Sequence, residues 1–143
     1  MSVFAQQFDV ETRGHNHVLN LTAAVEKLAA ASRIHDGIAV IFVVGSTAAI
    51  TTTEFEPGLV NHDLAAAFEK IAPRDGRYEH EKTWNDDNGH AHICAALLGP
   101  SLVIPVVSGR LPLGAWQQIV LIDFDTRPRT RTIIVQITGE AGM

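Results

Sequence analysis

The sequence predicts an α+β fold in which a mostly antiparallel, β-sandwich-like sheet packs with two or three helices. Runs of β-branched and aromatic residues recur along the chain and are typical of strands. Two segments carry apolar residues at helical spacing, and the strands of the C-terminal half follow one another through short turns, which favours antiparallel pairing. At 143 residues the chain has the length of one domain, residues 1–143, and can bury about two-thirds of its unfolded surface.

Nine segments account for this prediction. In chain order they are a strand at 3–12, a helix opening near Thr22, strands at 38–44 and 46–54, a helix from Pro57-Gly58 to about Ala72, a short helix at about 89–98, and strands at 101–107, 116–125 and 131–139. The segment between the second and third helices is expected to be a loop.

The first helix and the strand that follows it have clear local signals. Thr22 is a favourable N-cap residue, the Ala-rich run after it favours a helix, and Gly37 ends the connection. Residues 38–44 (IAVIFVV) have the β-branched and aromatic composition of a buried central strand.

The strand at 46–54 places a carboxylate in an unusual position. Side chains alternate between the two faces of a strand, so Ala48, Ile50, Thr52 and Glu54 share one face. This face is the more apolar one. Because burying an unpaired charge is costly, Glu54 is expected to have a partner there, in a functional site or in a structural ion pair.

The second helix ends before Pro73, which cannot continue it. Its apolar face consists of Val60, Leu64, Ala67, Phe68 and Ile71. His62 lies nearly opposite this face and is expected at the surface. Asp63 lies at the edge of the face, where a surface role and a site role are equally compatible with the pattern.

The C-terminal half has turn signals at Ser108-Gly109 and Arg127-Pro128. Gly99 suits the position after the end of the short helix, in which Cys94 is expected to be buried and inert. The alternating arginines near the last turn are interpreted as a charge ladder across a hairpin; the residues are Asp123, Asp125, Arg127, Arg129 and Arg131.

Composition excludes several function classes. The net charge of −5 argues against a nucleic-acid partner, whose phosphates need a basic surface. The single cysteine rules out a disulfide framework and a cysteine-based zinc cluster. Residues 1–13 do not resemble a signal peptide, and the longest apolar stretch is too short to span a membrane. A cytoplasmic location is therefore expected.

One stretch concentrates groups that can do chemistry. Residues 80–99 (HEKTWNDDNGHAHICAALLG) contain three of the seven histidines. If the segment from residue 89 is helical, His90 and His92 point about 200° apart and cannot bind one ion. If it is extended, they share a face. Spacing alone therefore leaves a metal site, an acid–base site and a solvated loop open, and His80 and Glu54 are the obvious further ligands.

The order of several motifs resembles that of the YjbQ-like family. They are GSTAAITTTEFEPG, YEHEKTWNDDNGHAH, LLGPSLVIPVVSGRLPLGAWQQIVLIDFDTRPRTR and VQITGE. The resemblance is strongest over residues 38–140. It implies a compact fold built around a sandwich-like sheet, assembly as a homotrimer, and a polar pocket of histidines and acidic residues that often holds a metal ion.

The resemblance also implies residue roles. Its matched positions comprise catalytic groups (Glu54, Asp63, His92), metal ligands (His80, His92, Glu54) and substrate-binding groups (Arg110, Trp116, Gln117). The cofactor would be a divalent ion, zinc or magnesium. The chain departs from the family at one place: many bacterial members have His-Thr-Thr or His-Thr-Ser where this chain has Gly45-Ser46-Thr47.

Two functions follow from the resemblance. The first is a secondary thiamine-phosphate synthase, which joins a pyrimidine diphosphate to a thiazole phosphate and expels pyrophosphate; Arg110 would meet a phosphate group. The second is a non-catalytic trimer that binds a metal or a small ligand. The missing histidine at position 45 favours the second, whereas the remaining matched residues favour the first.

Overall fold

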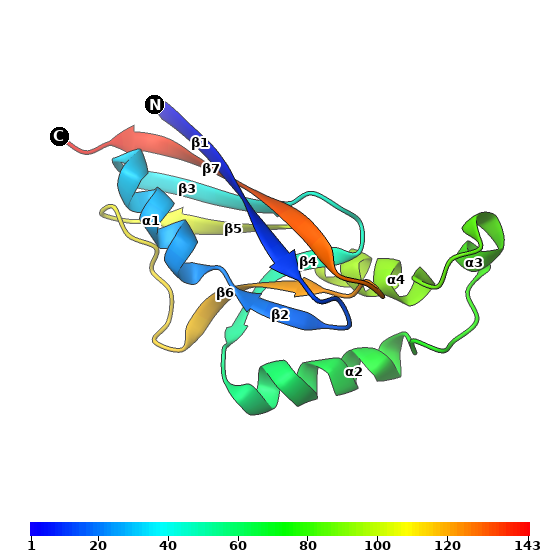
Figure 1. Cartoon of the computed structure of the whole chain (residues 1–143). Coiled ribbons are helices and arrows are strands. Elements are labelled where there is room, and N and C mark those ends of the chain that lie inside the picture. Colours follow the sequence, from blue (N-terminus) through cyan, green and yellow to red (C-terminus); the bar gives the residue numbers. More distant parts are fainter.

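Two antiparallel sheets stack on one another in the computed structural model, which describes residues 1–143 (Figure 1). The four-stranded sheet has the order β1 (Ser2–Thr12), β7 (Arg129–Ala141), β3 (Ile34–Val43) and β5 (Ser101–Val106). The three-stranded sheet has the order β2 (His17–Asn20), β6 (Gln117–Asp123) and β4 (Ala48–Glu54). The predicted α+β class with sandwich-like antiparallel sheets is confirmed.

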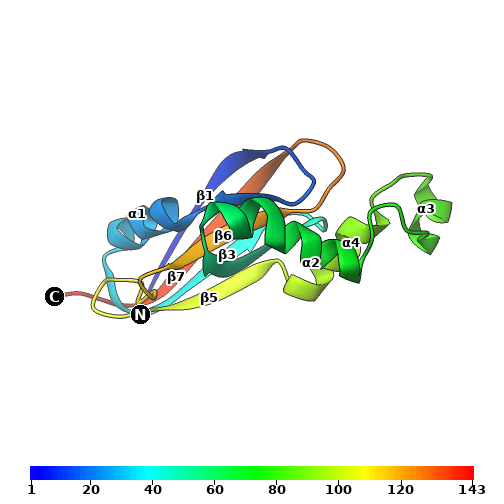
Figure 2. The same cartoon turned by 90° about the horizontal axis from the view of Figure 1, so that it is seen from below.

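The helices gather around the three-stranded sheet and at one end of the molecule. They are α1 (Thr22–Ser32), the π-helical turn η1 (Leu59–Asp63) that continues into α2 (Leu64–Ile71), α3 (Glu79–Trp84) and α4 (Gly89–Leu98). Viewed from below, α2 lies across the sheets and α3 projects at the end away from both termini (Figure 2). None of these helices combines the length and hydropathy needed to cross a bilayer.

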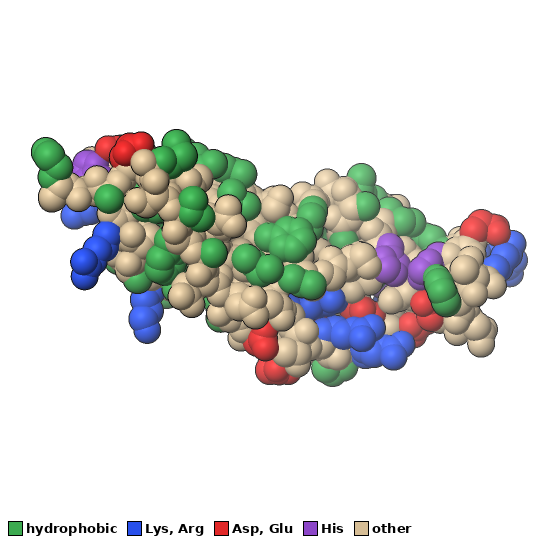
Figure 3. All heavy atoms as spheres, turned by 90° about the horizontal axis from the view of Figure 1, so that it is seen from above, with side chains coloured by type: hydrophobic (Ala, Val, Ile, Leu, Met, Phe, Trp, Pro, Cys, Tyr) green, Lys and Arg blue, Asp and Glu red, His purple; other side chains and the backbone are tan.

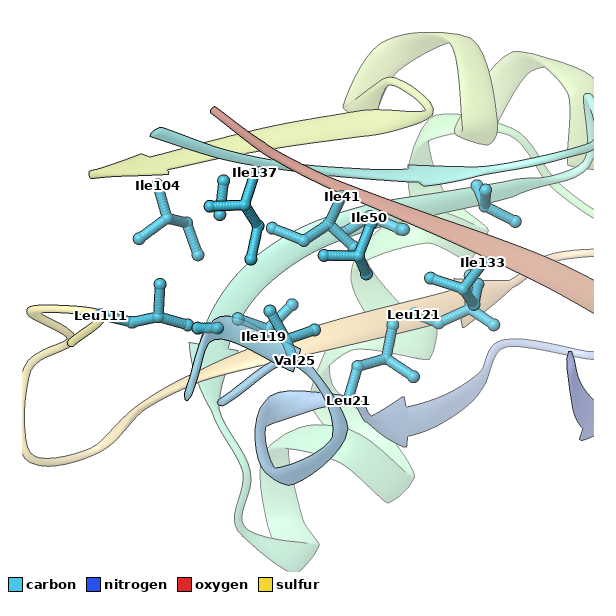
Figure 4. Close-up of a cluster of buried hydrophobic side chains, with 14 of the residues drawn as sticks. Leu21, Val25, Ile41, Ile50, Ile104, Leu111, Ile119, Leu121, Ile133 and Ile137 are labelled. Carbon is cyan, nitrogen blue, oxygen red and sulfur yellow. The ribbon is translucent and has the colours of Figure 1, made fainter. Parts of the chain in front are cut away.

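The main core lies between the two sheets. Ile41 of β3 and Ile133 and Ile137 of β7 point toward the three-stranded sheet, and Ile50 and Leu121 point back at them (Figure 4). In β3 and β7 the buried residues alternate with exposed or half-buried ones, because only one face of the four-stranded sheet is covered. Helix α1 closes one side of this core with Val25, which is fully buried.

A second core lies on the other face of the three-stranded sheet. Ala49, Val120 and Ile122 pack there against helical residues such as Val60 and Cys94. At its edge the rings of Phe68 and Phe124 meet edge to face, with centroids 4.9 Å apart. The three-stranded sheet is therefore covered on both faces, which is why residues 119–123 are buried without alternation.

Three local predictions need correction. Strand β3 begins at Ile34, four residues before the predicted start, because its polar beginning still pairs with β7. Strand β2 was not predicted, since its four residues are too short for a periodic signal. Helix α3 lies inside the predicted loop, and Asn85 ends it with a left-handed conformation (φ 54°).

The predicted inward face of Glu54 is also wrong. Ala48, Ala49 and Ile50 are all buried, Thr51 to Thr53 are half-buried, and Glu54 is exposed. Strand β4 enters between the two cores at its first residues and leaves them at its last. Burial therefore changes along the strand instead of alternating, and Glu54 does not need a partner within the core.

Candidate functional site

Helices α3 and α4 bring two of the predicted site histidines into contact. The imidazole rings of His80 and His92 lie edge to face, with centroids 4.6 Å apart. Figure 3 shows histidine side chains next to one another, close to acidic groups, at the end of the molecule that carries these helices. The predicted association of His80 with His92 is therefore observed within one chain.

The proton of His92 has a defined position in the neutral ring. Its Nδ1 lies 3.1 Å from the carbonyl oxygen of Ser46, and a carbonyl oxygen only accepts hydrogen bonds. Nδ1 must therefore carry the hydrogen, so the Nε2 of a neutral His92 has a free lone pair. A backbone carbonyl that fixes the tautomer in this way is typical of metal-ligating and proton-transferring histidines.

His80 is oriented by the opposite nitrogen. Its Nε2 lies 3.3 Å from Oδ1 of Asn88 and 3.4 Å from Oδ2 of Asp86. Both oxygens accept hydrogen bonds, so Nε2 carries the hydrogen and Nδ1 holds the lone pair of the neutral ring. The other carboxylate oxygen of Asp86, Oδ1, is buried and has no hydrogen-bond partner. Each histidine thus presents one basic nitrogen.

A buried polar network stands behind the histidines. The side-chain nitrogen of Asn88 lies 3.5 Å from Oδ1 of Asp125, which orients the amide so that its oxygen faces His80. Oδ2 of Asp125 accepts hydrogen bonds from Thr47 at 2.9 Å and Arg129 at 3.0 Å. Burial alone would raise the pKa of Asp125, but hydrogen bonds from the Thr126 N–H, Thr47 and Arg129 lower it below its ordinary value.

Arg131 and Asp123 form the innermost ion pair of this network. The guanidinium donates to both oxygens of Asp123, at 2.7 and 2.9 Å, and to the hydroxyl of Thr47 at 2.6 Å. Both side chains are almost completely buried, at 8% and 0% exposure. The predicted pairing of these arginines with the aspartates is observed, but it does not cross a hairpin, because β6 and β7 belong to different sheets, and the Arg131–Asp123 pair is buried between them.

A pocket of small residues opens beside His92. Its volume is about 420 Å³, and its lining consists of Gly45, Ser46, Ala48, His92, Ala95, Ala96 and Pro100. Gly45 adopts a φ of 138°, and a Cβ atom there would lie 2.6 Å from Nη1 of Arg131. Gly45 thus has a backbone conformation and a close approach that favour glycine.

His90 does not replace that histidine. It lies on the other side of α4, in a small pocket that also contains His15 and Arg74, and its Nδ1 is buried without a partner. Burial and the nearby Arg74 guanidinium lower the pKa of His90. The helical alternative for residues 89–98 is therefore correct, and it separates His90 from His92 as the helical geometry requires.

The other matched residues lie elsewhere. Glu54 and Gln117 are paired neighbours on β4 and β6, and Glu54 shares a shallow pocket with Trp116. The amide of Gln117 donates to Thr52 at 3.1 Å. Six residues of extended strand separate Glu54 from Ala48, which lines the His92 pocket, a distance of about 20 Å.

Two further residues are isolated from both groups. Asp63 is exposed and its carboxylate contacts its neighbour His62 at 2.8 Å. Arg110 lies in the turn after β5, in a hollow with Glu26 and Leu111. Within one chain, no three His, Cys, Asp or Glu side chains are arranged to hold a metal ion. The predicted convergence of Glu54 with His80 and His92 does not occur in a single chain.

Comparisons with known proteins agree with this architecture. A UPF0047 protein of Archaeoglobus fulgidus is 35% identical over 130 residues, which cover 91% of this chain and 98% of the relative. A UPF0047 protein of Methanothermobacter thermautotrophicus is 34% identical over 140 residues, covering 98% and 95%.

Solved structures with similar folds have a comparable level of identity. A YbjQ-like protein of unknown function from Sulfolobus solfataricus has a TM-score of 0.86 at 34% identity, with 97% of this chain and all of that chain covered. A hypothetical protein of Aeropyrum pernix has a TM-score of 0.88, also at 34% identity, with 96% and 99% covered. The family described as UPF0047 protein YjbQ-like matches residues 6–140, and the chain therefore belongs to the YjbQ family.

Proposed function

We propose that the chain is a cytoplasmic enzyme of the secondary thiamine-phosphate synthase type, which joins a pyrimidine diphosphate to a thiazole phosphate. The motif resemblance supplies the reaction class. The observation that supports a chemically active site is the His80–His92 pair, in which hydrogen bonds fix both rings so that each presents one basic nitrogen.

The reaction would develop negative charge on its leaving group, which the His80–His92 site could stabilise. A bond forms from the thiazole nitrogen to the carbon that carries the diphosphate, and the carbon–oxygen bond to the diphosphate breaks. Negative charge therefore grows on the leaving pyrophosphate. His80 and His92 present their free nitrogens at one site, where a positive charge held by them would stabilise the departing pyrophosphate, and charge stabilisation of this kind is commonly a large contribution to catalysis.

A divalent ion is the proposed cofactor. His92 through Nε2 and His80 through Nδ1 would hold it, and Asp86, at the opposite nitrogen of His80, would orient that ring. When bound, such an ion neutralises charge on a departing phosphate. Two imidazoles suit zinc better than magnesium, which prefers oxygen ligands. One chain supplies too few ligands for a closed site, so the remaining positions would be filled by the substrate, water or another subunit.

We also propose a homotrimer. The outer face of the four-stranded sheet carries apolar side chains that no part of this chain covers (Figure 3). Ile38 is 43% exposed, Phe42 37% and Val103 57%, and the pairing of β3 with β5 places them on the same face. Contiguous exposed apolar surface of this kind marks an interaction site. Light scattering should give three times the chain mass of 15.5 kDa.

The decisive experiment compares His92→Ala with His62→Ala. His62 is exposed on its helix, so it serves as a matched control. We expect His92→Ala to lose metal content and conversion of the two thiamine precursors while it still folds, and His62→Ala to resemble the wild type. Equal metal content and equal conversion in the wild type and His92→Ala would refute the proposed function.

The alternative is a non-catalytic trimer that binds a metal or a small ligand. It is favoured by Gly45, which removes the histidine found in many relatives, and by the incomplete ligand set of one chain. Zinc-loaded crystals distinguish the two functions. An ion with an open, water-filled position supports catalysis, and an ion with four protein ligands supports a structural role.

A further inference from the structure

The matched site residues fall into two incomplete halves at opposite ends of β4. One half has His80, His92 and an adjoining pocket but no third ligand arranged to hold a metal. The other half has Glu54 and Trp116. We infer that each active site is shared between two copies of this chain, with the histidines from one copy and Glu54 and Trp116 from the next. The inference rests on the proposed function for its chemistry.

The half that contains Glu54 has the properties of a protein–protein interface. The side chain of Glu54 is exposed and makes no hydrogen bond or ion pair within the chain, whereas the side chain of Glu56 accepts hydrogen bonds from the N–H groups of Gly58 and Leu59. Trp116 is 75% exposed. Tryptophan is one of the residue types enriched among the anchors of protein interfaces, so its exposure beside a free carboxylate indicates contact with another molecule.

The histidine half is complementary in shape and charge. The pocket beside His92 has a volume of about 420 Å³ and walls of small apolar side chains, among them Ala95, Ala96 and Pro100. This space can receive an indole ring. If Trp116 of a second copy occupied this pocket, the neighbouring Glu54 of that copy would lie close to His80 and His92. One carboxylate with two histidines is a common ligand set for zinc.

The apolar face of the four-stranded sheet is continuous with this pocket. Val44, which is 49% exposed, directly precedes Gly45, and Pro100 of the pocket directly precedes β5, which carries the exposed Val103. A copy that covers this face would therefore also reach His92. Because the two complementary surfaces are different and lie on the same chain, their contact is head to tail, and head-to-tail contacts close into rings such as the proposed trimer.

Disulfide trapping tests the arrangement without any assay of activity. Ala115 is exposed next to Trp116, and Ala96 is exposed at the pocket. A mixture of Ala115→Cys and Ala96→Cys should form a covalent dimer under mild oxidation, and neither variant alone should. The native Cys94 is buried and its pKa is raised by burial, so it stays unreactive. The control mixture is Ala115→Cys with Ile71→Cys, at an exposed site on α2.

Trapping no stronger than this control, or a monomer in light scattering at micromolar concentration, would overturn the inference. Either result leaves the proposed function standing, because the histidine pair belongs to one chain. Strong trapping in a protein that never converts the thiamine precursors would support the shared site and refute the proposed function.

Hybrid assemblies give a second, independent test. Glu54→Gln and His92→Ala are each expected to lose zinc binding and turnover. In rings refolded from an equal mixture, about one quarter of the contacts join an intact histidine half to an intact Glu54 half, so zinc content and turnover should return to about that fraction. If Glu54 and His92 act within one chain, every chain carries a defect and no recovery is possible, which would overturn the inference.

Discussion

Replacing Arg131 by methionine should strongly destabilise the protein. The guanidinium makes two hydrogen bonds to Asp123 and one to Thr47, and only 8% of its side chain is exposed. Removing one partner of such a buried pair costs about 3–5 kcal/mol, because the other charge stays buried without compensation. For a chain of this length each kcal/mol lowers the melting temperature by about 4 °C, so the expected decrease is about 12–20 °C.

Arg129→Met is the matched control for this experiment. Arg129 donates one hydrogen bond to Asp125 at 3.0 Å, and its side chain is 38% exposed. Its removal should cost less than about 1 kcal/mol, because solvent screens the partly exposed charge. Melting followed by circular dichroism at pH 7 measures both variants. Equal melting temperatures for Arg131→Met and Arg129→Met would show that the fully buried Arg131–Asp123 pair contributes nothing beyond the partly exposed Arg129–Asp125 pair.

The pH dependence adds a further check on the same variant. In the wild type the lowered pKa of Asp125 means that its stabilising contribution is present above its ordinary value of 3.8 and is lost as the pH falls through the lowered folded pKa. Without Arg131, whose guanidinium lies 3.7 Å from Oδ2 of Asp125, this buried carboxylate loses a positive neighbour and favours its charged form less. The difference in stability between wild type and variant should therefore be largest at neutral pH and shrink below about pH 4.

Three other outcomes are expected. Gly45→His should lower the melting temperature by several degrees, because its φ of 138° is unfavourable for a side chain and its Cβ would lie 2.6 Å from a pinned guanidinium. Burial and Arg13 lower the pKa of His17, whose Nδ1 accepts the Arg13 N–H. The unfolded chain therefore binds the proton more readily, and the free energy of unfolding should decrease as the pH falls below 6.5. Melting curves of His17→Gln should show a smaller decrease over the same pH range. Asn88→Ala combined with Asp86→Ala removes both acceptors of the His80 Nε2–H and should release His80 from its fixed tautomer. Nitrogen chemical shifts of the imidazole report the tautomer directly, and an unchanged one in the double variant would contradict the hydrogen-bond assignment.

Strong local patterns allowed much of the fold to be predicted. The alternating and β-branched runs identified the strands of the main core, and Pro73 and Gly99 bounded two of the helices. Helix α1 begins at Thr22 as predicted, but its N-cap is Leu21, and the Thr22 hydroxyl accepts the Ile119 N–H instead of capping the helix. Glu54 was misplaced because alternation assumes one covered face along a whole strand. Strand β4 has two covered faces at its start and none at its end, and this depends on helices that are distant in the sequence.

The candidate site was partly accessible from the sequence. Helical geometry correctly separated His90 from His92, and the motif resemblance selected His80 and His92. The network behind them was missed, because Asp123, Asp125, Arg129 and Arg131 have the same alternation as a solvated hairpin ladder. Only the packing of the two sheets determines that these side chains point inward. The sequence does contain one indication of their burial, the apolar run at residues 119–122 that leads directly into Asp123.

The position of this network explains why a costly arrangement is kept. Buried ion pairs seldom stabilise a protein more than apolar residues of the same shape would. Here, however, Arg131 binds Thr47, whose neighbour Ser46 supplies the carbonyl that orients His92, and Asp125 holds the Asn88 amide that orients His80. One buried cluster therefore sets both imidazoles in the tautomers that leave a free nitrogen on each. An apolar core could match its stability but could not direct two histidines in this way, so its role is best understood as the positioning of the site.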